Sequence, residues 1–312
     1  MGDPVSAPAN LTADSQRLSG FLRSIGSFSE DLILSFGTTE TLHHYTNLDG
    51  LLAILSSGDL RLTHSRYCND EAEMTHGLAL ASEVLADERS KATDPNRQVY
   101  LDELLRLSKE TAAEPVYIAC FCESLDRLSQ WRAYGANGTG VSLEFEPAQF
   151  SYITGPDLPP NIGLMRFWKV FYPRETQRKI IRSAINYYPN FEPTAAPNDW
   201  ASWTWEAIRF FLPTFKHQDF SEEEEWRLIF TPSQGVPVGP SYRVARGMLV
   251  PYYSLRELSQ AMGYPNRNLP LRSLRIGPSP NKALNLVSAR MLLDKYGYQH
   301  VTVSASSIPY RG

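Results

Sequence analysis

The sequence has few cysteines, no long apolar run and none of the common nucleotide-binding or hydrolase motifs. Its three cysteines, Cys68, Cys120 and Cys122, are an odd number and lack the spacing of a disulfide framework or a zinc site. No apolar run reaches the roughly 18 residues of a membrane span, and the N-terminus lacks the charged and apolar regions of a signal peptide. We therefore expect a cytoplasmic protein with no membrane partner.

The missing motifs narrow the range of enzyme classes. The sequence contains no GxxxxGK[ST] loop, no GxGxxG after a strand, no HExxH and no GxSxG. Its histidines and cysteines match no standard ligand spacing, so we expect no metal and keep a metal-dependent hydrolase only as a minor alternative. The 30 basic and 34 acidic residues give a net charge of -4, which predicts no general attraction to nucleic acid.

The patterns along the chain predict an α+β protein. Residues 1–40 are predicted to be an N-terminal arm, disordered at first and then helical, and residues 41–312 a single catalytic-type domain. Helical spacing predicts helices over residues 71–85, 97–111, 173–188, 200–212 and 281–296. Alternation and β-branched content predict strands over residues 116–122, 138–146, 164–172, 222–230, 242–250, 271–276 and 300–304.

Residues 41–70 carry the clearest start and stop signals in the chain, and they predict a strand, a helix and a second strand in that order. Asn47 is a good N-cap, leucines recur at the spacing of one helical face, and Gly58 stands where a left-handed C-cap belongs. We therefore expect a helix over Leu48–Ser57. In the strand before it, His43 and His44 point to opposite faces, so we expect only one of them in a given cleft.

Two further features concern organisation. Arg174, Arg178 and Arg182 lie four residues apart on a predicted helix, and we favour a solvated face over a docking surface for an acidic target. The Pro-rich segment at residues 189–198 is the best candidate for an internal boundary.

Four polar clusters carry the remaining signal for function. Taken singly, each has a structural explanation, namely a satisfied core histidine, a helix cap, a buried aromatic and a solvated acidic turn. The clusters are His44-Tyr45-Thr46; Arg66-Tyr67 with Asn69-Asp70; Ser129 to Arg132 with Tyr134; and Glu223, Glu225 and Arg227 on one face of a predicted strand.

Together the clusters resemble a bacterial domain family of unknown function. Its hallmark segments look like HYT, S-RY-ND, SQWR-YG, E-EWR, IGP and S-IPYR. All six are found here, at residues 44–46, 65–70, 129–135, 223–227, 276–278 and 307–311. This resemblance covers most of the chain but implies no activity.

A more distant resemblance does imply one. A strand ending in His and Thr, followed by a short helix of the pattern NL--IL--G-L, is similar to the first motif of ADP-ribosyltransferases, particularly the DarT-like and His-Tyr-Glu types. The resemblance implies a split β-sheet and an NAD site in which His44 holds the nicotinamide end and either Tyr67 or Tyr134 stacks on the ring. A late-strand carboxylate, Glu225 or Glu223, would complete the site.

The chemistry of that reaction suits these residue types. Cleavage of the nicotinamide–ribose bond passes through an oxocarbenium-like state, which a nearby carboxylate stabilises. We prefer Glu225, because alternation directs Trp226 and Leu228 into the core and leaves Glu225 deeper in the strand than Glu223. Arg66 and Arg132 suit the pyrophosphate. The predicted NAD-binding set is His44, Tyr45, Thr46, Arg66, Tyr67, Asn69, Gln130, Arg132 and Tyr134.

The leading hypothesis is therefore an NAD-dependent ADP-ribosyltransferase or NAD glycohydrolase. It would modify a macromolecular acceptor, protein or nucleic acid, in the manner of a toxin or an antiphage defence effector. The alternative from another class is a non-catalytic module that senses a nucleotide or a partner on the same fold.

Overall fold

The structure is a computed structural model that describes residues 13–26, 39–68, 72–110, 115–150, 154, 162–245, 247–265 and 268–309. It divides into two compact units, each assembled from three segments of the chain. We call Thr38–Cys68, Pro115–Val170 and Phe220–Gly312 the sheet unit, and Met1–Gly37, Asn69–Glu114 and Phe171–Asp219 the helical unit. The predicted division into an arm and a single domain at residue 40 stays a prediction.

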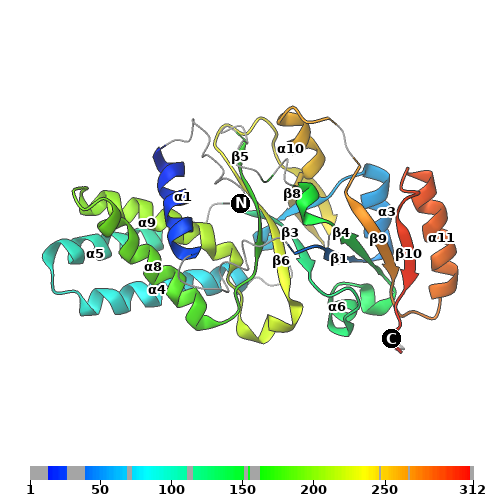
Figure 1. The fold of residues 1–312 in the computed structure, drawn as a ribbon, viewed down its shortest axis with the longest axis horizontal. Coiled ribbons are helices and arrows are strands. Elements are labelled where there is room, and N and C mark those ends of the chain that lie inside the picture. Colours follow the sequence, from blue (N-terminus) through cyan, green and yellow to red (C-terminus); the bar gives the residue numbers. More distant parts are fainter. Residues whose placement is uncertain are drawn as a thin grey trace, which may run out of the picture. The chain divides into compact units, whose positions relative to one another are not determined.

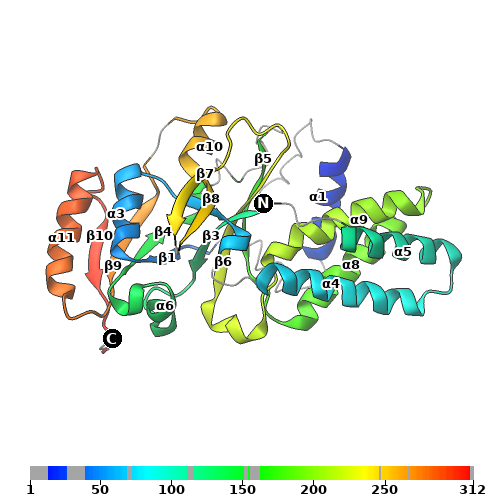
Figure 2. The same cartoon turned by 180° about the vertical axis from the view of Figure 1, so that it is seen from behind.

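All strands of the described residues belong to the sheet unit, where they form one mixed sheet of 10 strands (Figures 1 and 2). The strands are β1 (Leu42–Thr46), β2 (Arg61–His64), β3 (Tyr117–Cys122), β4 (Val141–Phe145), β5 (Gly163–Lys169), β6 (Glu225–Pro232), β7 (Ser241–Ala245), β8 (Met248–Ser254), β9 (Leu271–Ile276) and β10 (Thr302–Ala305). The accompanying helices and turns are α3 (Leu48–Ser57), η1 (Ser65–Tyr67), α6 (Leu128–Ala133), η2 (Ala136–Gly138), η3 (Pro147–Phe150), η5 (Gln218–Glu223), α10 (Leu255–Ala261) and α11 (Lys282–Lys295).

The sheet splits at β3. Its strand order is β10-β9-β4-β1-β3-β2-β8-β7, and β6 followed by β5 extends from the other edge of β3. Every pair is antiparallel except β9 with β10, which are joined through α11. Strand β6 pairs with the whole of β3, whereas the opposite edge of β3 is shared, with Cys122 pairing with β1 and Tyr117 and Ile118 pairing with β2. Strands β1 and β2 therefore separate along this edge.

The strand–helix–strand unit that begins at β1 forms as predicted. Helix α3 spans Leu48–Ser57, the Asn47 side chain accepts a hydrogen bond from the Gly50 amide, and Gly58 adopts a left-handed conformation with φ of 62°. The leucine spacing buries Leu51 and Leu55, whereas Leu48 and Leu52, expected on the same face, are 42% and 49% exposed. Local signals alone set this element, because cap, apolar stripe and C-terminal glycine all agree.

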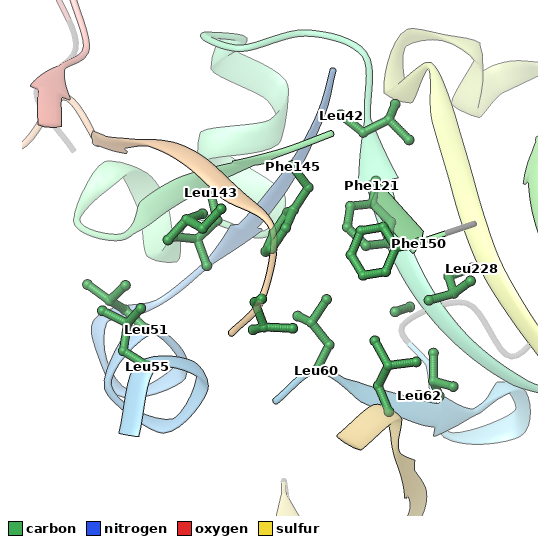
Figure 3. Packing of buried hydrophobic residues seen from close by; sticks show 14 of the residues in the cluster. Leu42, Leu51, Leu55, Leu60, Leu62, Phe121, Leu143, Phe145, Phe150 and Leu228 are labelled. Atoms are coloured by element: carbon green, nitrogen blue, oxygen red, sulfur yellow. The ribbon is translucent and has the colours of Figure 1, made fainter. Parts of the chain in front are cut away.

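One face of the sheet carries the apolar core (Figure 3). Phe121 of β3 packs edge-on against Phe145 of β4 with ring centroids 5.8 Å apart, and Leu228 of β6 is fully buried in the same cluster. Helices α3 and α11 contribute to this core through Leu55 and Leu293. Each fully buried Leu or Phe contributes roughly 1.5–3 kcal/mol, so the alternating apolar residues of these strands fix which face looks inward. The opposite face is free to carry polar side chains.

The helical unit consists of α1 (Ala13–Gly26), α4 (Ala72–Lys91), α5 (Pro95–Glu110), α8 (Arg174–Phe191), α9 (Pro197–Phe211) and the turn η4 (Leu212–Thr214). The basic stripe on α8 pairs with acidic residues of α4. Arg174 and Arg178 both pair with Glu83, and Arg182 lies 3.2 Å from Asp87 and 3.3 Å from Glu88. The stripe is therefore an ion-pair ladder within the unit.

The α+β class is confirmed, and three local predictions need correction. Pro189 lies inside α8, and the Pro-rich segment joins α8 to α9 within one unit, so it is not a boundary. Residues 242–250 contain parts of two strands that pair as a hairpin, because Gly247 adopts a positive φ of 73° between them. Strand β6 begins only at Glu225, which removes Glu223 from the strand. In the described residues no helix is long and apolar enough to cross a membrane.

Candidate active site

A cavity of about 70 Å³ opens in the sheet unit, where β1 and β3 meet. It has room for roughly five ordered waters, which is the scale of one flat ring and far from that of a whole dinucleotide. Six of the predicted site residues line it together with three that were not predicted for the NAD site. The lining residues are His43, His44, Tyr45, Cys120, Phe121, Gln130, Tyr134, Glu223 and Glu225.

His44 sits at the point where the sheet splits. Its Nδ1 lies 2.9 Å from the Cys120 carbonyl oxygen, so the imidazole contacts the β3 edge beyond the single pair that β1 makes at Cys122. A carbonyl only accepts, which means that Nδ1 carries the proton. Burial lowers the pKa of His44, although this hydrogen bond opposes the shift. The ring is therefore neutral at pH 7, and Nε2 is an acceptor without a partner among the described residues.

Glu225 is the most deeply buried carboxylate of the cavity. The residue is 4% exposed, and Arg227, two residues along β6, is 2% exposed. Arg227 donates from Nε and from the second terminal nitrogen to the two carboxylate oxygens, at 2.8 and 2.9 Å. This bidentate contact fixes the orientation of the carboxylate and compensates the charge that burial would otherwise penalise. The Cys120 thiol is a further hydrogen-bond partner of this carboxylate, and both residues line the cavity.

Glu223 reaches the same cavity by a different route from the one predicted. The strand begins at Glu225, and Glu224 before it adopts a left-handed φ of 44°, so the alternation expected for Glu223 and Glu225 does not apply. The Glu224 side chain is held outside the lining by the Ser124 hydroxyl at 2.9 Å and by Arg127 at 2.7 Å. The left-handed turn nevertheless leaves Glu223 bordering the cavity beside Glu225.

Two residues of the SQWR-YG segment hold Glu223. The Tyr134 hydroxyl donates to its Oε1 at 3.1 Å, and the buried Gln130 side chain donates to its backbone carbonyl at 3.5 Å. Tyr134 is half-buried and lines the cavity, which Tyr67 does not. Of the two tyrosines predicted to stack on a ligand ring, only Tyr134 is thus placed at the cavity.

Tyr45 lines the cavity but also has a structural task. Its hydroxyl donates to the Ser124 carbonyl at 2.8 Å and accepts from the Arg127 amide at 3.2 Å. Its ring packs edge-on against the fully buried Trp131, with centroids 4.8 Å apart. Burial raises the pKa of Tyr45 far above its ordinary value. The hydroxyl is therefore engaged by neighbouring backbone groups, with the Ser142 side chain as a further partner.

The other predicted residues lie outside the cavity lining. Arg66 and Arg132 are exposed, and Tyr67, 37% exposed, packs edge-on against His64 with centroids 5.5 Å apart. Thr46 lies at the end of β1, where its Oγ1 comes so close to Gly50 that a β-carbon there would be only 2.1 Å away. Asn69 lies outside the described residues. The pyrophosphate roles of the arginines stay predictions.

Sequence reasoning missed His43, Cys120 and Phe121. The expectation that His43 and His44 cannot face one cleft is wrong, because β1 leaves β3 after a single pair and the cavity borders a strand edge as well as a face. Burial, with Glu225 beside it, raises the pKa of the Cys120 thiol well above its usual range, so the thiol is a poor nucleophile. The periodicity of a single strand does not show where the strand separates from its neighbour.

No group of His, Cys, Asp and Glu residues with metal-binding geometry occurs in the part of the chain that the structure describes.

Comparison with known proteins adds one family match. The family model described as "Protein of unknown function (DUF2971)" matches residues 130–228. The matched segment runs from Gln130 to Leu228 and so includes Tyr134, Glu223 and Glu225. No curated protein and no solved structure matches the sequence. The match agrees with the predicted resemblance to a domain family of unknown function.

Proposed function

We propose that the sheet unit binds NAD and cleaves its nicotinamide–ribose bond, passing ADP-ribose to a macromolecular acceptor or to water. One observation carries this proposal. A single cavity at the split of the sheet brings together a neutral histidine acceptor, a tyrosine ring and two carboxylates, which are His44, Tyr134, Glu223 and Glu225. This set matches the residue types that the ADP-ribosyltransferase resemblance implies.

Each residue has a defined task in the proposed reaction. The bond from ribose C1′ to the nicotinamide nitrogen breaks, nicotinamide leaves with the electron pair, and the acceptor or water attacks C1′ and loses a proton. Glu225, fixed by Arg227, lies beneath the developing positive charge, and Glu223 supports it. The ring of Tyr134 offers an aromatic face to the flat cationic nicotinamide. The neutral His44 adds a hydrogen bond without adding repulsive charge.

The cavity volume limits what it can hold. With about 70 Å³ it suits the nicotinamide end of NAD, and the rest of the dinucleotide must lie over the surface of the sheet unit. Arg66 and Arg132, both exposed, are the predicted contacts for that remainder. We further propose that the whole stretch from Leu42 to Arg311 belongs to the family of unknown function, in a cytoplasmic toxin or defence protein.

A second candidate function is a non-catalytic nucleotide-sensing module. The observation that favours it is the bidentate pairing of Glu225 with Arg227, because the guanidinium cancels much of the field that a carboxylate would exert on a cationic sugar. Such a module would bind NAD and release no nicotinamide.

The experiment that separates the two candidates is incubation of the purified protein with NAD, with free nicotinamide followed by chromatography, in the presence and absence of cell extract. We expect release by the wild type and loss of release in Glu225→Gln. The matched control is Glu222→Gln, whose exposed side chain does not line the cavity. Calorimetric binding of NAD without nicotinamide release would support the sensing module. No binding of NAD, NADP or ADP-ribose by folded protein would refute both.

A further inference from the structure

His43 is a buried histidine whose ring has no partner in the described protein. The residue is 3% exposed and lines the cavity, and its Nδ1 is fully enclosed without a hydrogen bond. Its Nε2 has no protein partner among the described residues either, and it is not enclosed in the same way. A buried polar group that stays unsatisfied costs about 1–3 kcal/mol, so some group outside the protein is expected to bond this ring.

Two further polar atoms lie on the same face of the sheet as Nδ1 of His43. Among the described residues Arg275 Nε on β9 is enclosed without a partner, and Ser142 on β4, whose hydroxyl interacts with Tyr45, is directly opposite Arg275 in the sheet. Ser142 also pairs with Tyr45, two residues after His43 on β1, so all three atoms lie on the same face of adjacent strands. An ordered water on this face would satisfy Nδ1 of His43.

The chemistry of these neighbours sets the tautomer of His43. The Arg275 Nε–H can only donate, and Arg275 is close enough to His43 to lower the pKa of its ring, so this face offers Nδ1 a donor. Glu144, the direct partner of His43 across the strands, accepts from the Ser273 hydroxyl and makes no hydrogen bond with Nδ1. Nδ1 is then the acceptor of the bridging water, and Nε2 carries the proton. His44 has the opposite arrangement, with the proton on Nδ1 and an acceptor at Nε2.

We propose that His43 and His44 together recognise a primary carboxamide, with His43 Nε2–H donating to its carbonyl oxygen and His44 Nε2 accepting from its NH₂ group. The inference rests on the proposed function, because nicotinamide is the carboxamide that NAD would bring to this cavity. It adds His43 as a ligand-binding residue and assigns its orientation to Ser142 and Arg275. A carboxylate in place of the carboxamide would have nothing to donate to His44 and would face Glu225.

The first test uses the wild-type protein and free ligands, so it does not depend on any variant folding. Calorimetry with nicotinamide, nicotinate and 3-acetylpyridine at millimolar concentration should give the order nicotinamide, then 3-acetylpyridine, then nicotinate. The ketone keeps the acceptor for His43 and lacks the donor for His44, so we expect it to bind several-fold more weakly than the amide. Equal affinity for nicotinate and nicotinamide, or no binding of any of the three, would overturn the proposal.

The second test compares side chains at residue 43 that have or lack an N–H donor at the position of Nε2. His43→Gln keeps an N–H near the position of Nε2, whereas His43→Leu removes it, so the leucine variant should lose about tenfold in nicotinamide affinity and the glutamine variant little. Near-UV circular dichroism checks that both fold. Wild-type affinity in a folded leucine variant would exclude the assignment. If the protein prefers the amide but releases no nicotinamide from NAD, this inference stands and the proposed reaction is rejected. If it releases nicotinamide but shows no preference for the amide, the proposed reaction stands and this inference is rejected.

Discussion

The basic stripe on α8 and the polar residues of the cavity look alike in sequence but differ in how their hydrogen bonds are satisfied. In the helical unit, Arg182 of α8 pairs with both Asp87 and Glu88 of α4, so positive charge on one helix is matched by negative charge on the other. At the cavity, His43 Nδ1 is enclosed without a partner among the described residues, and only one ring nitrogen of His44 bonds to that part of the chain. Charged groups that pair with one another within the protein indicate a structural role. Polar atoms beside a cavity that have no protein partner indicate a binding site.

The Glu225–Arg227 pair stands between these two cases. Like the ladder on α8, it is a satisfied ion pair, with two contacts of 2.8 and 2.9 Å. Like the cavity residues, it is almost completely buried and borders the space where a ligand would lie. Its response to mutation therefore shows to which class it belongs.

Arg227→Ala should cause the largest loss of stability. It leaves the Glu225 carboxylate buried without its cation, which typically costs 3–5 kcal/mol, and urea unfolding at pH 7 measures the loss. The matched control is the double variant Glu225→Gln with Arg227→Met, which removes both charges and should recover most of the stability. A single variant as stable as the wild type would mean that solvent reaches this pair.

The protonation of His43 should make stability depend on pH. Burial lowers the pKa of His43 from 6.5 to about 4, Arg275 adds to the decrease and Glu144 opposes it. Between these two pH values the unfolded chain binds a proton that the folded protein excludes, so stability is lost as the pH falls from 6.5 toward 4. The loss from this residue is about 3 kcal/mol at most.

His43→Gln gives the comparison for this pH effect. The variant has no imidazole at residue 43, so its free energy of unfolding should fall less steeply than that of the wild type over the same interval. The pKa of His44 is lowered as well, which leaves part of the slope in place. Parallel curves for the two proteins would show that His43 already titrates normally in the folded state.

Glu225→Gln should strongly slow turnover without abolishing ligand binding. The amide keeps the shape of the carboxylate and removes its charge, so we expect a loss of at least ~2 kcal/mol of transition-state stabilisation, roughly 30-fold in rate. Glu223→Gln should cost less, because Glu223 is less deeply buried. If Glu223→Gln were the dead variant and Glu225→Gln kept its activity, Glu225 would belong with the structural ion pairs.

The sequence predicted most reliably the elements whose signals are local. Helix α3 was predicted to the residue, since its cap, its leucine spacing and Gly58 lie within a dozen positions. Strand β9 likewise spans the predicted residues 271–276. The inward direction of Trp226 and Leu228 also follows from alternation alone, and both are in the core.

The parts that sequence reasoning missed depend on relations between strands. His43 and His44 both line the cavity because β1 leaves β3 directly after His43, and Glu223 reaches it because Glu224 turns left-handed just before β6. Neither event changes the periodicity of the segment in which it occurs. The same limit applies to the α8 stripe, because its acidic partners lie on α4, roughly 90 residues earlier in the chain.

The ion-pair ladder should give the smallest effect. Arg182 and Glu88 approach to 3.3 Å, but their side chains are 34% and 18% exposed, so solvent screens the pair. A double-mutant cycle with Arg182→Ala and Glu88→Ala should give a coupling energy of about 0.2–1 kcal/mol, decreasing with added salt. Nicotinamide release by both single variants should equal that of the wild type, because neither residue lines the cavity. A coupling energy of several kcal/mol, or a loss of nicotinamide release, would show that this ion pair contributes as much to stability or activity as the cavity residues do. The two regions would then not differ in role.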